Sequence, residues 1–198
     1  FQSGSSISLD WNNIVNLKQR YRRRERPVGS TIYLPMVPGI REDNAVEWGG
    51  DKLNPLAMAG AGVDAILAVC SVGTIPFDFP PGSVGYATQY IDFTGVEMTF
   101  TKSDAKFTSM TNPFDQEMNV KLHSVLSKIQ PGLKLDRTYW LAHGPHFETT
   151  AEINAIEKLG GEVVGMTMPR ECKLAAELEI PYAAILVSSN WAAGREPG

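Results

Sequence analysis

The sequence lacks several features that would assign it to a familiar class of protein. It contains no apolar run of the roughly 18 residues that a membrane-spanning helix needs. It has only two cysteines, Cys70 and Cys172, which form no Cys-x-x-Cys pair, and its three histidines show no metal-ligand spacing. A formal net charge of −4 provides no basic field for nucleic acid. We therefore expect two free buried thiols, no metal, no membrane or nucleic-acid partner, and a reducing, cytoplasmic compartment.

The common catalytic motifs are missing as well. The sequence contains no Walker loop, no Gly-x-Gly-x-x-Gly after a strand and no Ser, His and Asp in the order of a hydrolase triad. It also has no repeats and no low-complexity linker. The 198 residues, of which 43% are hydrophobic, suffice for one domain with a proper core. Because Phe1-Gln2-Ser3 resembles the remnant of an engineered protease site, we expect residues 1–7 to be a tag or disordered leader and residues 8–198 to be the domain.

Hydrophobic periodicity predicts alternating strands and helices along the chain. Strands are expected at 31–36, 65–72, 86–93, 138–142, 162–165 and 183–187, and helices at 10–24, 53–61, 114–129, 149–159 and 169–178, with a loop at 39–51. This alternation predicts an α/β fold in which helices flank a central mixed, largely parallel sheet.

Ligands of such sheets bind beyond the carboxyl ends of strands, which here points to the turns after Val72, His143 and Val187. Near these turns lie a carboxylate (Glu148), an apolar side chain with a hydroxyl beside it (Met166-Thr167) and an amide (Asn190). Each residue also has a purely structural explanation: a favourable charge at a helix N-terminus, core packing, a helix cap, or a turn. Together they suit a flat heterocycle with donors and acceptors on its edge.

The region from Tyr139 to Asn190 resembles the core of the trimeric purine nucleoside phosphorylase and methylthioadenosine phosphorylase family. The matching residues are Gly144-Pro145-His146-Phe147-Glu148-Thr149, Ala151-Glu152, Lys158-Leu159-Gly160, Val164-Gly165-Met166-Thr167, Glu171 and Ser189-Asn190. Residues 190–195 are similar to the branch that cleaves methylthioinosine, and weaker similarity covers 62–64, 71–75, 91–94 and 110–114.

The resemblance implies a nucleoside phosphorylase-like fold and cleavage of the N-glycosidic bond of a 6-oxopurine nucleoside, such as inosine, guanosine or methylthioinosine, by phosphate. Glu148 is then expected to bind N1–H of the purine, and Asn190 to bind N7 and O6. An amide can donate to a carbonyl oxygen, whereas an ionised carboxylate only accepts, so Asn190 favours a 6-oxo base.

The resemblance also implies the remaining members of the site. The base and ribose are expected to contact Phe147, Met166, Ala142 and His143, and the phosphate to contact Thr167, Ser71, Val72 and Arg41. No cofactor is implied, since phosphate is a co-substrate. Family members form trimers in which a neighbour's aromatic residue completes the pocket, and Phe107 and Phe114 are the candidates here.

The sequence also departs from the family pattern. No glycine-rich phosphate loop precedes Thr31, Glu42 stands where the family has a histidine after Arg41, and the family's C-terminal helix has no counterpart. Two alternatives therefore stay open. One is a nucleoside hydrolase or another enzyme of ribosylated purines, in which Glu42 or Asp43 activates water. The other is a purine-binding protein without catalysis.

Overall fold

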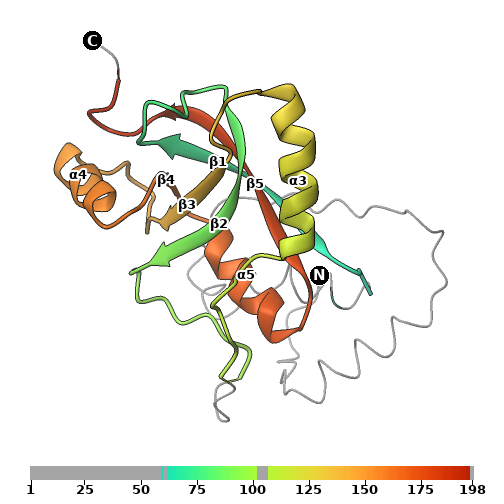
Figure 1. Cartoon of the computed structure of the whole chain (residues 1–198). Helices are drawn as coiled ribbons and strands as arrows, with labels where there is room; N and C mark the ends of the chain where they lie inside the picture. The colour runs from blue at the N-terminus through green and yellow to red at the C-terminus, as the bar shows by residue number, and fades with distance from the viewer. Residues whose placement is uncertain (1–58, 60–61, 102–106, 197–198) are drawn as a thin grey trace, which may run out of the picture.

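The computed structural model describes residue 59, residues 62–101 and residues 107–196. In this part of the chain, five strands close into a barrel in the order β1-β4-β3-β2-β5 (Figure 1). The strands are β1 (Ile66–Thr74), β2 (Val84–Asp92), β3 (Asp136–Leu141), β4 (Val163–Gly165) and β5 (Tyr182–Trp191).

The barrel mixes parallel and antiparallel pairs. Strands β1 and β5 run parallel, as do β2 with β3 and β3 with β4, whereas β1 with β4 and β2 with β5 are antiparallel. The predicted α/β class with a mixed, largely parallel sheet is thus confirmed. Closure of the sheet was not predicted, because periodicity reports which residues are buried and not which strands meet.

Among the described residues, three helices pack on the outside of the barrel: α3 (Gln116–Ile129), α4 (Thr150–Lys158) and α5 (Met168–Glu177). Figure 1 shows α3 along one side of the barrel, α4 on the other side and α5 below it. Helix α4 begins with the predicted capping box, in which Thr149 and Glu152 bond each other's backbone N–H groups. None of the described helices is long and apolar enough to cross a membrane.

The main core joins the strands of the barrel to α5, and a second core lies on another side of the barrel. Along β3 the residues alternate, so that Arg137, Tyr139 and Leu141 are buried in the barrel. Both cysteines are free and buried in the main core, as expected. The second core joins α4 to the outer face of the barrel and consists of Ile75, Ile153, Ile156, Val164 and Ala192.

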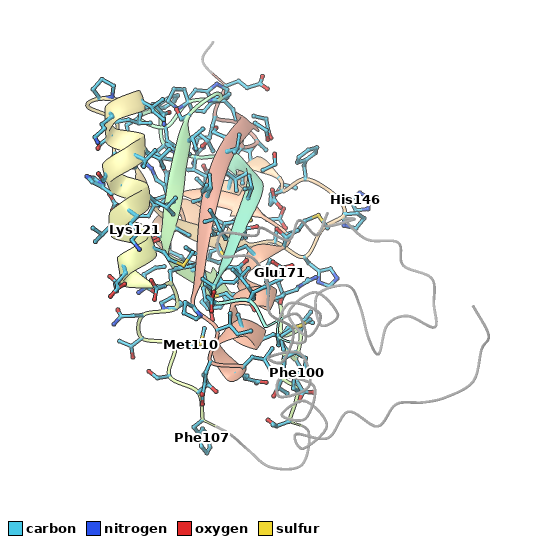
Figure 2. All side chains as sticks on the ribbon, turned by 90° about the vertical axis from the view of Figure 1, so that its right-hand side faces the viewer. Phe100, Phe107, Met110, Lys121, His146 and Glu171 are labelled. Carbon is cyan, nitrogen blue, oxygen red and sulfur yellow. The ribbon has the colours of Figure 1, made fainter. Side chains whose placement is uncertain are left out.

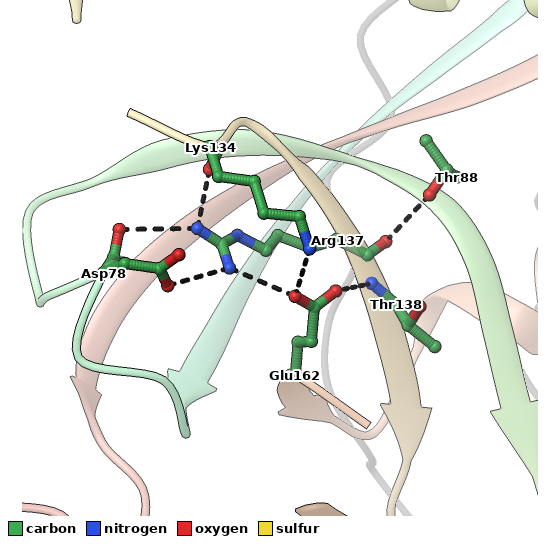
Figure 3. A network of polar contacts seen from close by, with 6 residues as sticks. All are labelled: Asp78, Thr88, Lys134, Arg137, Thr138 and Glu162. Carbon is green, nitrogen blue, oxygen red and sulfur yellow. Dashed lines mark hydrogen bonds and ion pairs between the residues drawn. The ribbon is translucent and has the colours of Figure 1, made fainter. Parts of the chain in front are cut away.

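Arg137 fixes one end of the barrel (Figure 3). Its side chain is 1% exposed, and its Nη1 atom lies 3.0 Å from Oδ1 of Asp78 and 3.2 Å from Oε1 of Glu162. Its Nη2 donates to the Lys134 carbonyl at 2.7 Å, and the guanidinium lies 4.7 Å from the centre of the Phe79 ring. One buried cation therefore joins the loop after β1, the start of β3 and the residue before β4.

The predicted elements between residues 65 and 187 are all present, with ends that differ by a few residues. The main correction concerns β5, which continues to Trp191, so that Asn190 lies within the strand and not past its end. The predictions for 10–24, 31–36, 39–51 and most of 53–61 lie outside the described residues, as does the proposed domain boundary at residue 8.

Candidate active site

The loop between β3 and α4 carries the predicted carboxylate. Gly144 adopts a φ of 67°, a conformation that L side chains rarely adopt, and a Cβ on it would lie 2.8 Å from Cε of Met166. The loop backbone therefore packs directly on the Met166 side chain, which is 36% exposed. Met166 and the loop with Glu148 are thus in contact, although they belong to different strand ends.

A cavity of about 600 Å³ opens beside this loop. Its lining includes four predicted residues, Ala142, His143, Phe147 and Glu148, and it extends along α4. Phe147 is 85% exposed, so it stands at the open side of the cavity. The arrangement places a carboxylate in an open, partly apolar cavity, as binding of a planar base by its edge would require.

Two aromatic residues of the cavity were missed in the sequence. Phe93 and Trp140 line it and pack edge to face, with ring centres 5.3 Å apart. Successive side chains of a strand point to opposite faces. Because Tyr139 is buried in the barrel, the next residue of β3, Trp140, points outward. Phe93 directly follows β2, and its place beside the loop depends on the pairing of β2 with β3, which the sequence does not reveal.

Asn190 lies in β5 opposite Gly73 of β1. Its Nδ2 donates to the Trp191 carbonyl at 2.9 Å, and its Oδ1 accepts from the Ser189 hydroxyl at 2.8 Å. The same hydroxyl lies 3.2 Å from the Val72 carbonyl oxygen. A Cβ on Gly73 would lie 3.4 Å from Nδ2 of Asn190, so the amide rests against the β1 backbone.

The segment after Asn190 runs to α4, the helix that follows Glu148. A Cβ on Gly194 would lie 2.6 Å from Cγ2 of Thr150, and Nη2 of Arg195 lies 2.7 Å from Oε2 of Glu157. The chain that carries the amide and the loop that carries the carboxylate therefore flank the same helix. Asn190 is not among the residues that line the cavity, and the roles of Glu148 and Asn190 toward a base stay a prediction.

The predicted phosphate contacts come from β1 and the start of α5. Thr167 is the N-cap residue of α5 but makes no cap hydrogen bond with its side chain, so capping does not explain its hydroxyl. That hydroxyl bonds the thiol of Cys70, whose pKa burial raises to about 12. Cys70 directly precedes Ser71, which is exposed, and Val72, which is buried. Thr167 and this part of β1 are therefore neighbours, while Arg41 lies outside the described residues.

One predicted intersubunit residue is wrong. Phe114 is 1% exposed and packs in the core against Tyr90 and Tyr182, so it cannot reach a neighbouring subunit. Phe107 is 97% exposed, and Figure 2 shows it projecting from the lower end of the molecule. Within the described residues, no group of three or more His, Cys, Asp or Glu residues could hold a metal ion.

Comparisons with known proteins agree on one family. The family model described as "Phosphorylase superfamily" matches residues 52–198. A protein of Methanopyrus kandleri, named a probable S-methyl-5'-thioinosine phosphorylase, is 39% identical over 140 residues, which cover 70% of this chain and 55% of the relative. The 6-oxopurine nucleoside phosphorylase of Pyrococcus furiosus is 34% identical over 152 residues, covering 72% of this chain and 57% of the relative. The chain thus spans little more than half the length of these relatives.

A solved structure supports the fold. A variant of the adenosine/methylthioadenosine phosphorylase of Schistosoma mansoni, in complex with methylthioadenosine, superimposes with a TM-score of 0.66 at 23% sequence identity. The superposition covers 73% of this chain and 59% of that structure.

Proposed function

Because this chain belongs to the phosphorylase superfamily, we propose that it cleaves the N-glycosidic bond of a 6-oxopurine nucleoside with phosphate. Inosine, guanosine and methylthioinosine are the proposed substrates, and no cofactor is required. The observation that carries this proposal is the placement of Glu148 and Asn190 on chain segments that flank the same helix, α4. Relatives named for 6-oxopurine nucleosides and for methylthioinosine support the choice of base.

The proposed chemistry depends on charge that arrives on the purine as its bond to the sugar breaks. The Asn190 amide donates to N7 or O6, and its hydrogen bond strengthens as the leaving base becomes negative. Glu148 accepts N1–H and fixes the orientation of the ring. Phosphate, held by the Thr167 hydroxyl and the backbone at Ser71 and Val72, captures the sugar at C1. Met166 and Phe147 cover the ribose and base.

The decisive experiment measures liberated base from inosine, guanosine, methylthioinosine and adenosine, each with and without phosphate. We expect release that depends on phosphate and favours the 6-oxopurine nucleosides. Asn190→Ala is expected to lower kcat by about 10²- to 10³-fold, as loss of a transition-state donor does in other enzymes. Asn154→Ala is the matched control, because this exposed asparagine lies on the outer surface of α4 and bonds only the Arg195 guanidinium in the described region.

Other outcomes would replace the proposal with one of its alternatives. Base release that is independent of phosphate would indicate a hydrolase. Base binding without turnover would indicate a purine-binding protein. Full activity of both Asn190→Ala and Glu148→Ala would refute the assignment of the site.

We also propose a homotrimer in the cytoplasm. Phe107, almost fully exposed and projecting from the molecule in Figure 2, is the aromatic residue proposed to contact a neighbouring subunit. Sedimentation equilibrium tests the trimer, and Phe107→Ser is expected to raise the KM for nucleoside more than the KM for phosphate. A monomer with full activity would overturn this part of the proposal.

A further inference from the structure

Helix α5 is capped in an unusual way. The first N–H groups of a helix need acceptors, which the side chain of the N-cap residue commonly supplies. Thr167, the N-cap residue of α5, does not do so. Instead the phenol oxygen of Tyr139, on β3, accepts the N–H of Thr167 at 3.3 Å and also bonds the backbone of Met168.

A glycine on the neighbouring strand β4 leaves space for this phenol. Tyr139 is fully buried in the barrel, and a Cβ on Gly165 would lie 2.1 Å from its oxygen. The φ angle of Gly165 is not positive, so glycine is needed here for space and not for backbone conformation. Strand β4 therefore ends with its backbone directly against the phenol, two residues before Thr167.

This arrangement releases the Thr167 side chain from the cap. Its hydroxyl instead bonds the Tyr139 phenol and the Cys70 thiol. Burial raises the pKa of both the phenol and the thiol, so both stay neutral at physiological pH. Two neutral groups behind Thr167 place no negative charge of their own near an anion.

We propose that Tyr139 is a positioning residue, which accepts the backbone N–H of Thr167 at the start of α5 and thereby holds Thr167 in place to bind inorganic phosphate. This inference rests on the proposed function, in which Thr167 binds phosphate. The inference gives Tyr139 a role in specificity for the anion, although its sequence position indicates only a core residue.

The test compares Tyr139→Phe with wild type in the full chain, with initial rates measured against phosphate and against nucleoside separately. We expect the KM for phosphate to rise by about three- to tenfold, the effect of one lost neutral hydrogen bond. The KM for nucleoside should stay within a factor of about two. Tyr86→Phe is the matched control, since it also loses one phenol hydrogen bond, to His123 at 3.2 Å, on the outer side of the barrel. It should leave the KM for phosphate unchanged.

A double-mutant cycle separates positioning from general loosening of the fold. If Tyr139 acts through Thr167, Tyr139→Phe should add nothing to the KM for phosphate in a Thr167→Ala background. Gly165→Ala, which displaces the phenol without removing it, is a second variant and should also raise the KM for phosphate. An unchanged KM for phosphate in both Tyr139→Phe and Gly165→Ala, equal changes in the two KM values, or additive effects with Thr167→Ala would each overturn the inference.

The outcomes also distinguish this inference from the proposed function. Wild-type protein that releases base without any dependence on phosphate refutes the phosphorylase proposal, and the inference with it. Wild-type protein that depends on phosphate, together with an unaltered Tyr139→Phe variant, refutes only the inference. The melting temperature of each variant with increasing phosphate gives an independent measure of phosphate binding.

Discussion

In the proposed function, the choice between 6-oxo and 6-amino bases rests on a single atom of Asn190. Its amide nitrogen can donate to a carbonyl oxygen at purine position 6, whereas a carboxylate oxygen in the same place can only accept, as a 6-amino group requires. The surroundings of Asn190 hold the side chain against Gly73 and Trp191, so the position of the amide is set before a ligand arrives.

Asn190→Asp is therefore expected to reverse the preference for the base. The ratio of kcat/KM for inosine to that for adenosine should fall by about 10²-fold, since an unpaired polar group facing the base costs a few kcal/mol. Measured kcat/KM values for both nucleosides check this, with Asn154→Asp, on the exposed face of α4, as a control. An unchanged ratio would show that Asn190 does not contact position 6.

A second residue-scale effect concerns Asp92 at the end of β2. Burial by itself would raise the pKa of this carboxyl, but hydrogen bonds from Lys173 and Thr94 outweigh it and hold the pKa below its ordinary value. A carboxyl whose pKa is lower in the folded state stabilises the fold above the unfolded pKa, about 3.9. This stabilisation is lost as the pH falls through the lower folded value.

Urea unfolding of wild type and Asp92→Asn at pH 7 and at pH 3 tests this effect. At pH 7 the substitution is expected to lower the free energy of unfolding by about 1–3 kcal/mol, through loss of charge-assisted hydrogen bonds. At pH 3 the difference should shrink. Asp64→Asn, at an exposed position before β1, should have little effect at either pH. A difference that is equal at both pH values would rule out the charge as its origin.

At the scale of elements, the end of α3 is joined to β2 by one side chain. Gln130, which follows the helix, accepts the Val84 N–H at 2.9 Å and donates to the Val84 carbonyl at 2.7 Å. The side-chain amide thus pairs with the backbone of β2 as a neighbouring strand would. It fixes the helix to the start of β2, before that strand pairs with β3.

Gln130→Ala should lower the free energy of unfolding by about 1–3 kcal/mol, because it leaves a donor and an acceptor of β2 without their partner. Lys121→Ala, on the exposed side of the same helix, should change it by less than about 0.5 kcal/mol. Chemical denaturation measures both. Equal losses in the two variants would mean that the amide contributes nothing specific.

The elements also show what the sequence could predict. Strand β1 was predictable from its near-continuous apolar run, and α4 because Thr149 and Glu152 have the spacing of a capping box. The end of β5 was not, because Ser188, Ser189 and Asn190 are polar and read as a loop. Ser188 pairs with Val72 and Asn190 with Gly73, and the register skips Ser189 between them; no local pattern reveals such long-range pairing.

The site divides in the same way. Glu148 lies in the cavity lining, as residue type, position and resemblance led us to expect, whereas the binding roles of Met166, Thr167 and Asn190 stay predictions. The hydroxyl of Tyr139 could not be predicted, because a buried tyrosine on a strand reads as core, and its bond to Thr167 depends on a glycine two residues earlier.

At the scale of the whole molecule, the Arg137 network holds together segments that are distant in sequence. Figure 3 shows the guanidinium between Asp78 and Glu162, with Glu162 also bonded to Lys134 and to the Thr138 N–H. The partners differ in exposure: Asp78 is 58% exposed and Glu162 24% exposed. Arg137 and Glu162 should therefore contribute more to the free energy of unfolding than Asp78 does.

Arg137→Ala is expected to destabilise the protein by about 3–5 kcal/mol, since it removes one member of a buried ion pair and opens space above Phe79. Asp78→Ala should cost less than about 1 kcal/mol, as exposed ion pairs do. Thermal or urea unfolding distinguishes the two. Comparable losses of stability in the two variants would show that the salt bridge to Asp78, and not burial of the guanidinium, accounts for most of the contribution of Arg137.

The parallel pairing of β1 with β5 has a consequence for synthesis of the chain. Strand β1 pairs with β5, beginning with Ile66 and Tyr182, and β5 is the last of the described strands to be synthesised. One edge of β1 therefore stays unpaired until β5 has left the ribosome. At translation rates of about 5–20 residues per second, that wait lasts for several seconds at least. During this interval the nascent chain carries an apolar strand with an open edge, a surface that is prone to aggregation and that molecular chaperones bind.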